Sequence, residues 1–156
     1  GFQGYRAGLK IVCVDSLTSL QCIWFPGSFQ ERVFMPSVAI IGASNKRDKF
    51  SNKAVRAYLK HGWKVYPVHP KEASVEEQQA YPSLASVSGP MDRVVLYVPP
   101  QAGMVVLDEM ASHRQAELFI SPGADSPELL EKAGKLRLKF TQNCAIVALG
   151  EDPNQL

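Results

Sequence analysis

Cysteine is scarce in this chain of 156 residues, which contains only Cys13, Cys22 and Cys144. An odd number of cysteines without paired spacing provides neither a disulfide framework nor a zinc-binding motif. We therefore expect no metal site, and we expect the reducing cytoplasm as the compartment of this protein.

Long apolar runs and an excess of one charge are also missing. No apolar run reaches the roughly 18 residues of a membrane-spanning helix. The 17 Lys and Arg residues and the 15 Asp and Glu residues leave a net charge of only +2. Aromatic residues do not alternate with basic ones as in a stacking surface for single-stranded nucleic acid. We therefore expect neither a membrane nor a nucleic acid as a partner.

Residues 1–34 differ from the rest of the chain, because their apolar stretches follow no clear period. Met35 directly precedes the first well-supported strand and is a natural start for the domain. We expect a Rossmann-like domain over residues 35–156 and an N-terminal extension of undefined structure over residues 1–34. The alternative is that residues 1–34 add a strand or a helix at the edge of the sheet.

Residues 38–53 predict a strand, a tight turn and a helix. The apolar residues 38–41 are typical of a strand buried on both faces. Gly42 permits a sharp turn, and Ser51 is the expected N-cap of the helix. Free N–H groups at a helix start favour an anion, typically a phosphate. The stretch also carries four cations: Lys46, Arg47, Lys49 and Lys53. A first β-α unit without a ligand is the alternative.

Apolar and amphipathic segments alternate along the rest of the chain. The predicted elements are strands at 63–68, 93–98, 118–120 and 138–141, and helices at 101–113 and 126–135. Residues 71–79 are polar and are expected to form a loop or a short helix. This alternation indicates an α/β fold, namely a Rossmann-like three-layer domain with a mainly parallel sheet of five or more strands. Ligands of such sheets bind beyond the carboxyl ends of the strands.

The motifs of the common nucleotide-binding sites are incomplete. Residues 42–47 contain one glycine instead of G-x-G-x-x-G, and the second predicted strand ends in His69-Pro70 rather than in a carboxylate. No P-loop motif occurs, so hydrolysis of ATP or GTP is not expected. An NAD(H)-binding regulatory domain is therefore the weakest of the alternatives.

Short motifs spread over about residues 37–150 resemble those of the CoA-binding domain family. This family includes small stand-alone proteins similar to the N-terminal domain of succinyl-CoA synthetase α subunits. The motifs are Ile40-Ile41-Gly42-Ala43-Ser44, Phe50-Ser51-Asn52-Lys53, Val65-Tyr66-Pro67-Val68-His69-Pro70, Tyr81-Pro82-Ser83-Leu84, Asp92-Arg93-Val94, Val98-Pro99-Pro100, Pro122-Gly123-Ala124 and Cys144-Ala145-Ile146-Val147.

The resemblance implies that coenzyme A binds across the strand ends. The diphosphate would lie along Gly42, Ala43 and Ser44, with Lys46 or Arg47 on a phosphate and Ser51, Asn52 and Lys53 at the helix start. The adenine and ribose would lie between Val68, His69 and Pro70, and the pantetheine path between Val98 and Pro99 on one side and Pro122 and Gly123 on the other. The family usually has Gly in place of Ser51 and Asn in place of His69.

No catalytic residue is evident. His69 has no acid or nucleophile beside it in the sequence, His61 and His113 are expected on exposed helix ends, and Cys144 is expected as a small buried apolar residue. We therefore predict a non-catalytic protein that binds the small molecule CoA or an acyl-CoA. The alternative is an orphan subunit of an acyl-CoA ligase. The oligomeric state stays open, and a homo-oligomer is compatible with the sequence.

Overall fold

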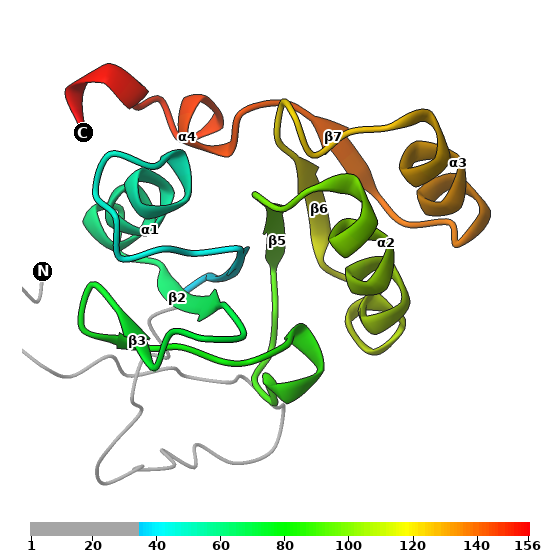
Figure 1. Cartoon of the computed structure of the whole chain (residues 1–156), viewed down its shortest axis with the longest axis horizontal. Coiled ribbons are helices and arrows are strands. Elements are labelled where there is room, and N and C mark those ends of the chain that lie inside the picture. The colour runs from blue at the N-terminus through cyan, green and yellow to red at the C-terminus, as the bar shows by residue number, and fades with distance from the viewer. Residues whose placement is uncertain (1–34) are drawn as a thin grey trace, which may run out of the picture. The chain divides into compact units, whose positions relative to one another are not determined.

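The centre of the protein is one parallel sheet of five strands (Figure 1). The computed structural model describes residues 35–156, and the expected N-terminal extension, residues 1–34, lies outside the described residues. The sheet has the order β2-β1-β5-β6-β7, and every neighbouring pair is parallel. The strands are β1 (Ser37–Ile41), β2 (Lys64–Val68), β5 (Arg93–Leu96), β6 (Glu117–Ile120) and β7 (Phe140–Gln142). The predicted Rossmann-like α/β fold is confirmed.

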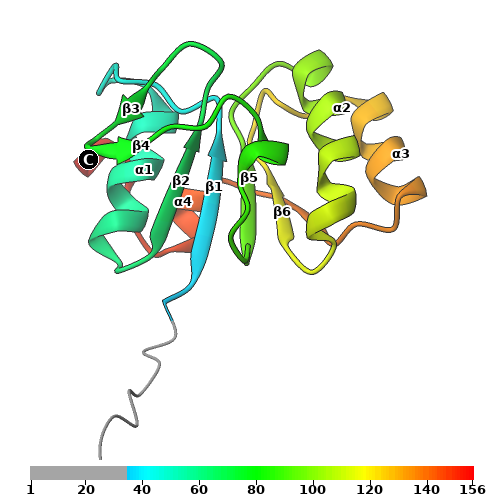
Figure 2. The same ribbon diagram turned by 90° about the horizontal axis from the view of Figure 1, so that it is seen from below.

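Helices cover both faces of the sheet, which makes three layers (Figure 2). The helices are α1 (Phe50–Lys60), α2 (Pro100–Glu109), α3 (Pro127–Lys135) and α4 (Ala145–Ala148). Val38 and Ile40 of β1 belong to the apolar cluster of α1 and α4, whereas Ala39 and Ile41 belong to that of α2 and α3. Because successive strand residues point to opposite faces, β1 is buried on both sides, as its unbroken apolar sequence predicts.

Two helix boundaries follow the residues expected to form them. α1 ends shortly before Gly62, whose φ of +76° suits glycine at this position. The Ser126 Oγ accepts a hydrogen bond of 3.1 Å from the N–H of Leu129, and Pro127 is the first residue of α3. Local sequence therefore sets these two boundaries.

The start of α1 differs from the expectation. The N–H of Lys53 donates to the carbonyl of Lys49 at 3.0 Å, so the first helical turn already closes on Lys49. Ser51 lies inside this turn, is only 5% exposed and is not the N-cap. No side chain of the described residues caps α1, and the N–H groups at the start of the helix have no partner within it.

Residues 71–79 do not form the expected loop or short helix. They contain a hairpin of β3 (Ser74–Val75) and β4 (Gln78–Gln79). Its turn residues Glu76 and Glu77 have φ values of +46° and +63°, which are conformations that Asn and Gly favour. The turn therefore lacks the residues that predict a hairpin, and the complete burial of Val75 helps to hold it in place.

His113 was expected to be exposed, and this expectation is wrong. α2 continues after Glu109 as the 3-10 turn η2 (Met110–His113). Residues three apart lie on the same side of a 3-10 helix, so His113 is buried together with Met110. His61 is exposed, as expected.

Two further 3-10 turns complete the described chain, η1 (Leu84–Ser86) and η3 (Pro153–Gln155). Strand β5 ends two residues before the expected boundary at residue 98, and β7 begins two residues after the expected start at residue 138. Within residues 35–156, every helix is too short or too polar to span a bilayer.

Candidate functional site

The carboxyl ends of four strands meet at one edge of the sheet. Ile41 is in register with Val68 of β2 and with Leu96 of β5, and Leu96 is in register with Ile120 of β6. The segments that follow these strands, residues 42–44, 69–70, 97–99 and 121–123, therefore lie along the same edge. The sequence predicted this convergence from the order of the elements alone.

Gly42 brings the turn after β1 into close contact with the end of β5. Its φ is +84°, and its N–H donates to the carbonyl of Val68 at 2.8 Å. A Cβ at this position would lie 2.7 Å from the Tyr97 carbonyl oxygen and 2.8 Å from the Val98 Cγ1. Both the backbone conformation and the lack of space require glycine here.

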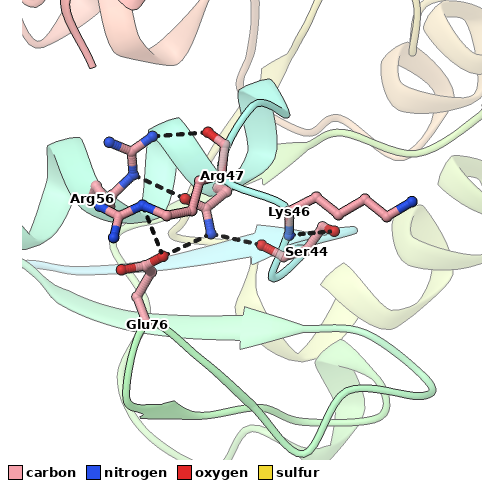
Figure 3. A network of polar contacts seen from close by, with 6 residues as sticks. Ser44, Lys46, Arg47, Arg56 and Glu76 are labelled. Atoms are coloured by element: carbon pink, nitrogen blue, oxygen red, sulfur yellow. Dashed lines mark hydrogen bonds and ion pairs between the residues drawn. The ribbon is translucent and has the colours of Figure 1, made fainter.

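The loop after Gly42 is held by a polar network around Asn52 (Figure 3). The fully buried Asn52 side chain donates through Nδ2 to the Ser44 carbonyl at 2.8 Å and to Glu76 Oε1 at 3.1 Å. Its Oδ1 accepts from the Arg56 Nε at 2.9 Å, and the Arg56 Nη2 donates to the Arg47 carbonyl at 2.9 Å. The side-chain polar atoms of Asn52 are thus used inside the protein, where they fix the shape of the loop.

The β3–β4 hairpin forms a second support for this loop. The Asn45 Nδ2 donates to Glu72 Oε2 at 2.7 Å and to the Ser74 carbonyl at 2.8 Å. The Arg47 Nε lies 3.8 Å from Glu76 Oε1. Neither Glu72 nor Glu76 was predicted as a site residue. The sequence of residues 71–79 contains no sign that these side chains reach a loop about 25 positions earlier.

The predicted cations of the loop have different surroundings. The Lys53 Nζ donates to the Pro153 carbonyl at 2.7 Å and lies 5.7 Å from the centre of the Phe50 ring, so it supports the C-terminal turn. The Lys46 side chain is exposed and extends away from Glu76 (Figure 3). The Arg47 side chain is 68% exposed. Lys49 is exposed as well, so Lys46, Arg47 and Lys49 are cations of this loop that a ligand can reach.

His69 caps the turn that follows β2. Its Nδ1 accepts hydrogen bonds from the N–H groups of Lys71 and Glu72, at 3.1 and 3.2 Å. Two backbone donors on Nδ1 require the tautomer that carries its proton on Nε2. The Nε2–H is left as the donor that His69 offers to a ligand.

An open groove separates the segment after β5 from the segment after β6. It has a volume of about 330 Å³ and is lined by residues 97–100 and 121–124. The predicted pantetheine residues Val98 and Pro99 lie on one wall, and Pro122 and Gly123 lie on the other. A larger hollow of about 610 Å³ lies near the amino ends of β6 and β7, with Glu117 and Phe140 in its lining, away from this edge.

The buried hydroxyl groups of Tyr97 and Ser121, at the same edge, have no hydrogen-bond partner in the part of the chain that the structure describes. Burial raises the pKa of the Tyr97 hydroxyl well above its ordinary value, and the neighbouring Cys144 adds to this shift. Cys144 itself is half-buried and packs against the apolar cluster of α1. These side chains place polar atoms in an otherwise apolar layer.

Comparison with known proteins decides the family. The model of the CoA binding domain family matches residues 36–150. The chain belongs to this family. As a member of the CoA binding domain family, it shares 35% identity over 63 residues with the alpha subunit of the acetate–CoA ligase [ADP-forming] II of Pyrococcus furiosus, which is 40% of this chain and 14% of that subunit. This chain therefore spans only a small part of that relative.

Solved structures show the same fold. A conserved hypothetical protein of Pyrococcus furiosus is 27% identical, with a TM-score of 0.66 over 74% of this chain and 99% of that one. The dinucleotide-forming acetyl-coenzyme A synthetase 1 of Ca. Korarchaeum cryptofilum, in complex with phosphate and ADP, is 24% identical. Its TM-score is 0.57, over 72% of this chain and 27% of that one.

Proposed function

We propose that this member of the CoA binding domain family binds coenzyme A or an acyl-CoA at the carboxyl edge of its sheet and does not catalyse a reaction by itself. One observation carries the proposal: the glycine turn after β1, the accessible cations that follow it and the groove between the segments after β5 and β6 lie along the same edge. CoA is a long ligand with a diphosphate at its middle and an uncharged arm at one end. The edge offers complementary chemistry in the same order.

The diphosphate is assigned to residues 42–44. Gly42 allows this turn to pack closely against the end of β5, and Asn52 donates a hydrogen bond to the carbonyl of Ser44. Both contacts hold the backbone of the turn in place. Lys46 and Arg47 supply positive charge next to it. A preorganised loop with backbone N–H groups and neighbouring cations is a favourable site for phosphate.

The adenine and ribose of the ligand lie on one side of this turn, and its pantetheine arm lies on the other. Val68, His69 and Pro70 flank the adenine and ribose, where the His69 Nε2–H is the available donor. The groove between Val98 and Pro122 accepts the pantetheine arm. Of the residues predicted for phosphate binding, Asn52 and Lys53 use their side chains to hold the loop and the C-terminal turn, and the buried Ser51 lies in the first turn of α1.

Titration calorimetry of the full chain with CoA tests the proposal. Replacing both Lys46 and Arg47 by Ala is expected to weaken binding by at least about tenfold, because hydrogen bonds to charged groups contribute roughly 1.5–3 kcal/mol. The matched control replaces Lys135 and Lys139, which are also exposed but lie in α3 and directly before β7. Affinity should also fall as the salt concentration rises. Absence of binding at millimolar CoA, or tighter binding of NADH than of CoA, would contradict the proposal.

The similarity to an acetate–CoA ligase alpha subunit favours a second function. In this alternative, the chain works as one subunit of an acyl-CoA ligase and a separate subunit supplies the nucleotide site. Thioester formation from acetate, ATP and CoA in a mixture with such a subunit, but not with either protein alone, would support it.

A further inference from the structure

Carboxylates lie against the loop that the proposed function assigns to phosphate. Glu72, just before β3, contacts Asn45, and Glu76, in the turn between β3 and β4, contacts Arg47 and Asn52. Figure 3 shows Glu76 beside Arg47. Acids at a site for an anion are unfavourable, because like charges repel at short range. Of these two carboxylates, Glu76 bears more directly on ligand binding, since it pairs with Arg47, an accessible cation of the loop.

The Glu76 carboxylate is held in place. Its side chain is 22% exposed, and its Oε1 accepts from the fully buried Asn52 Nδ2 at 3.1 Å. Asn52 cannot follow a moving carboxylate, because its other hydrogen bonds hold it to the carbonyl of Ser44 and to Arg56. The hairpin turn also restricts the backbone of Glu76.

Arg47, in contrast, is free to change partner. Its side chain is 68% exposed, and its Nε lies 3.8 Å from Glu76 Oε1, at the long end for an ion pair. Exposed pairs of this kind contribute little to stability. A phosphate that accepts two hydrogen bonds from a guanidinium binds more strongly than this. A phosphate that reaches the loop can therefore take Arg47 from Glu76.

We infer that Glu76 is an internal anion that competes with the ligand diphosphate for Arg47 and so lowers the affinity of this chain for CoA. The inference rests on the proposed function. It gives Glu76 an affinity-setting role: the side chain occupies the cation before the ligand arrives, and its fixed charge stays beside the site afterwards.

The test compares Glu76→Gln with Glu77→Gln in the full chain by calorimetry with CoA. Gln keeps the size of the side chain and a carbonyl oxygen for Asn52, but it removes the charge. Glu77 lies in the same turn, also has a positive φ and is exposed, so its variant has the same change in net charge without the contact to Arg47. We expect E76Q to bind CoA about three- to tenfold more tightly than the unaltered chain, and E77Q to stay within about twofold.

A second pair of variants tests whether the effect passes through Arg47. In an R47A background, E76Q is expected to lose most of its gain in affinity. Full retention of the gain in that background, or equal or weaker binding by E76Q in the first comparison, would overturn the inference. If E76Q melts at a lower temperature than the unaltered chain, Glu76→Gly replaces it, because glycine suits the φ of +46°.

The outcomes separate the inference from the proposed function. Binding of CoA by the unaltered chain without a gain in E76Q contradicts the role of Glu76 and leaves the proposed function intact. No binding by the unaltered chain contradicts both.

Discussion

The backbone of Gly42 lies so close to Tyr97 that a Cβ on Gly42 would be 2.7 Å from the Tyr97 carbonyl oxygen. This contact joins the turn after β1 to the end of β5, the strand beside it in the sheet. The site therefore depends on a position where the chain tolerates no side chain at all.

Replacement of Gly42 by Ala should destabilise the fold. The φ of +84° and the short contact to Tyr97 both oppose a side chain, and together they are expected to lower the free energy of unfolding by about 3 kcal/mol. Urea denaturation followed by circular dichroism measures this change. Gly62→Ala is the matched control, because Gly62 has a similar φ of +76°, but no described residue other than its two chain neighbours has an atom within 4 Å of the Cβ position. It should cost about 1 kcal/mol, and equal losses in the two variants would exclude the close contact as a cause.

Replacement of Tyr97 by Phe should stabilise the protein. The buried Tyr97 hydroxyl has no hydrogen-bond partner among residues 35–156, so its removal is expected to raise the free energy of unfolding by about 1 kcal/mol. Thermal melting of the two proteins at neutral pH measures the difference. A clear loss of stability in the variant would mean that the hydroxyl is bonded in solution.

The same residue predicts an alkaline limit to stability. Burial raises the pKa of Tyr97 in the folded state above its unfolded value, so the folded state holds the proton more tightly. This contribution is complete below the unfolded pKa of about 10 and is lost as the pH rises above it. Melting temperatures are measured between pH 8 and 11, at steps on the order of one pH unit. As the pH rises, the melting temperature of Tyr97→Phe should fall less steeply than that of Tyr81→Phe.

Glu151 predicts an acid limit. Hydrogen bonds from Lys60 and from His61 lower the pKa of this carboxyl group in the folded state, with Nζ–Oε1 and Nε2–Oε1 distances of 2.9 and 2.8 Å. The contacts of Glu151 with Lys60 and His61 therefore stabilise the fold above the unfolded pKa of Glu, about 4.3. This stabilisation is lost as the pH falls through the lower pKa of the folded state. Glu151→Gln should be less stable than the unaltered chain at neutral pH, and the difference should shrink in acid. A difference independent of pH would contradict the ion pair.

The domain boundary also remains a prediction. Every described strand and helix lies between residues 37 and 155, and we propose that residues 35–156 fold without residues 1–34. A protein shortened to residues 35–156 is expected to melt in one cooperative transition. A broad or absent transition, measured by circular dichroism, would show that residues 1–34 are needed for folding.

Local features of the sequence were sufficient for most of the fold. The apolar run of β1, the glycine after it and the Ser126-Pro127 start of α3 each act through residues that are neighbours in the chain. Burial on two faces, φ and helix capping are local requirements, so their residues can be recognised without a structure. The order of the elements then placed the strand ends at one edge.

Contacts between residues far apart in the sequence could not be predicted from these local features. Asn52 meets Glu76 across 24 positions, and Lys53 meets Pro153 across 100. These contacts engage the side chain of Asn52 with the loop and that of Lys53 with the C-terminal turn, and they bring the Glu76 carboxylate close to Arg47. The chain's own pattern of apolar residues, glycines and caps was enough to define a parallel α/β domain whose strand ends meet at one edge. Which side chains at that edge are free, and which are already bonded, depends on tertiary packing, because a hydrogen bond between remote segments leaves no periodic signal in either of them.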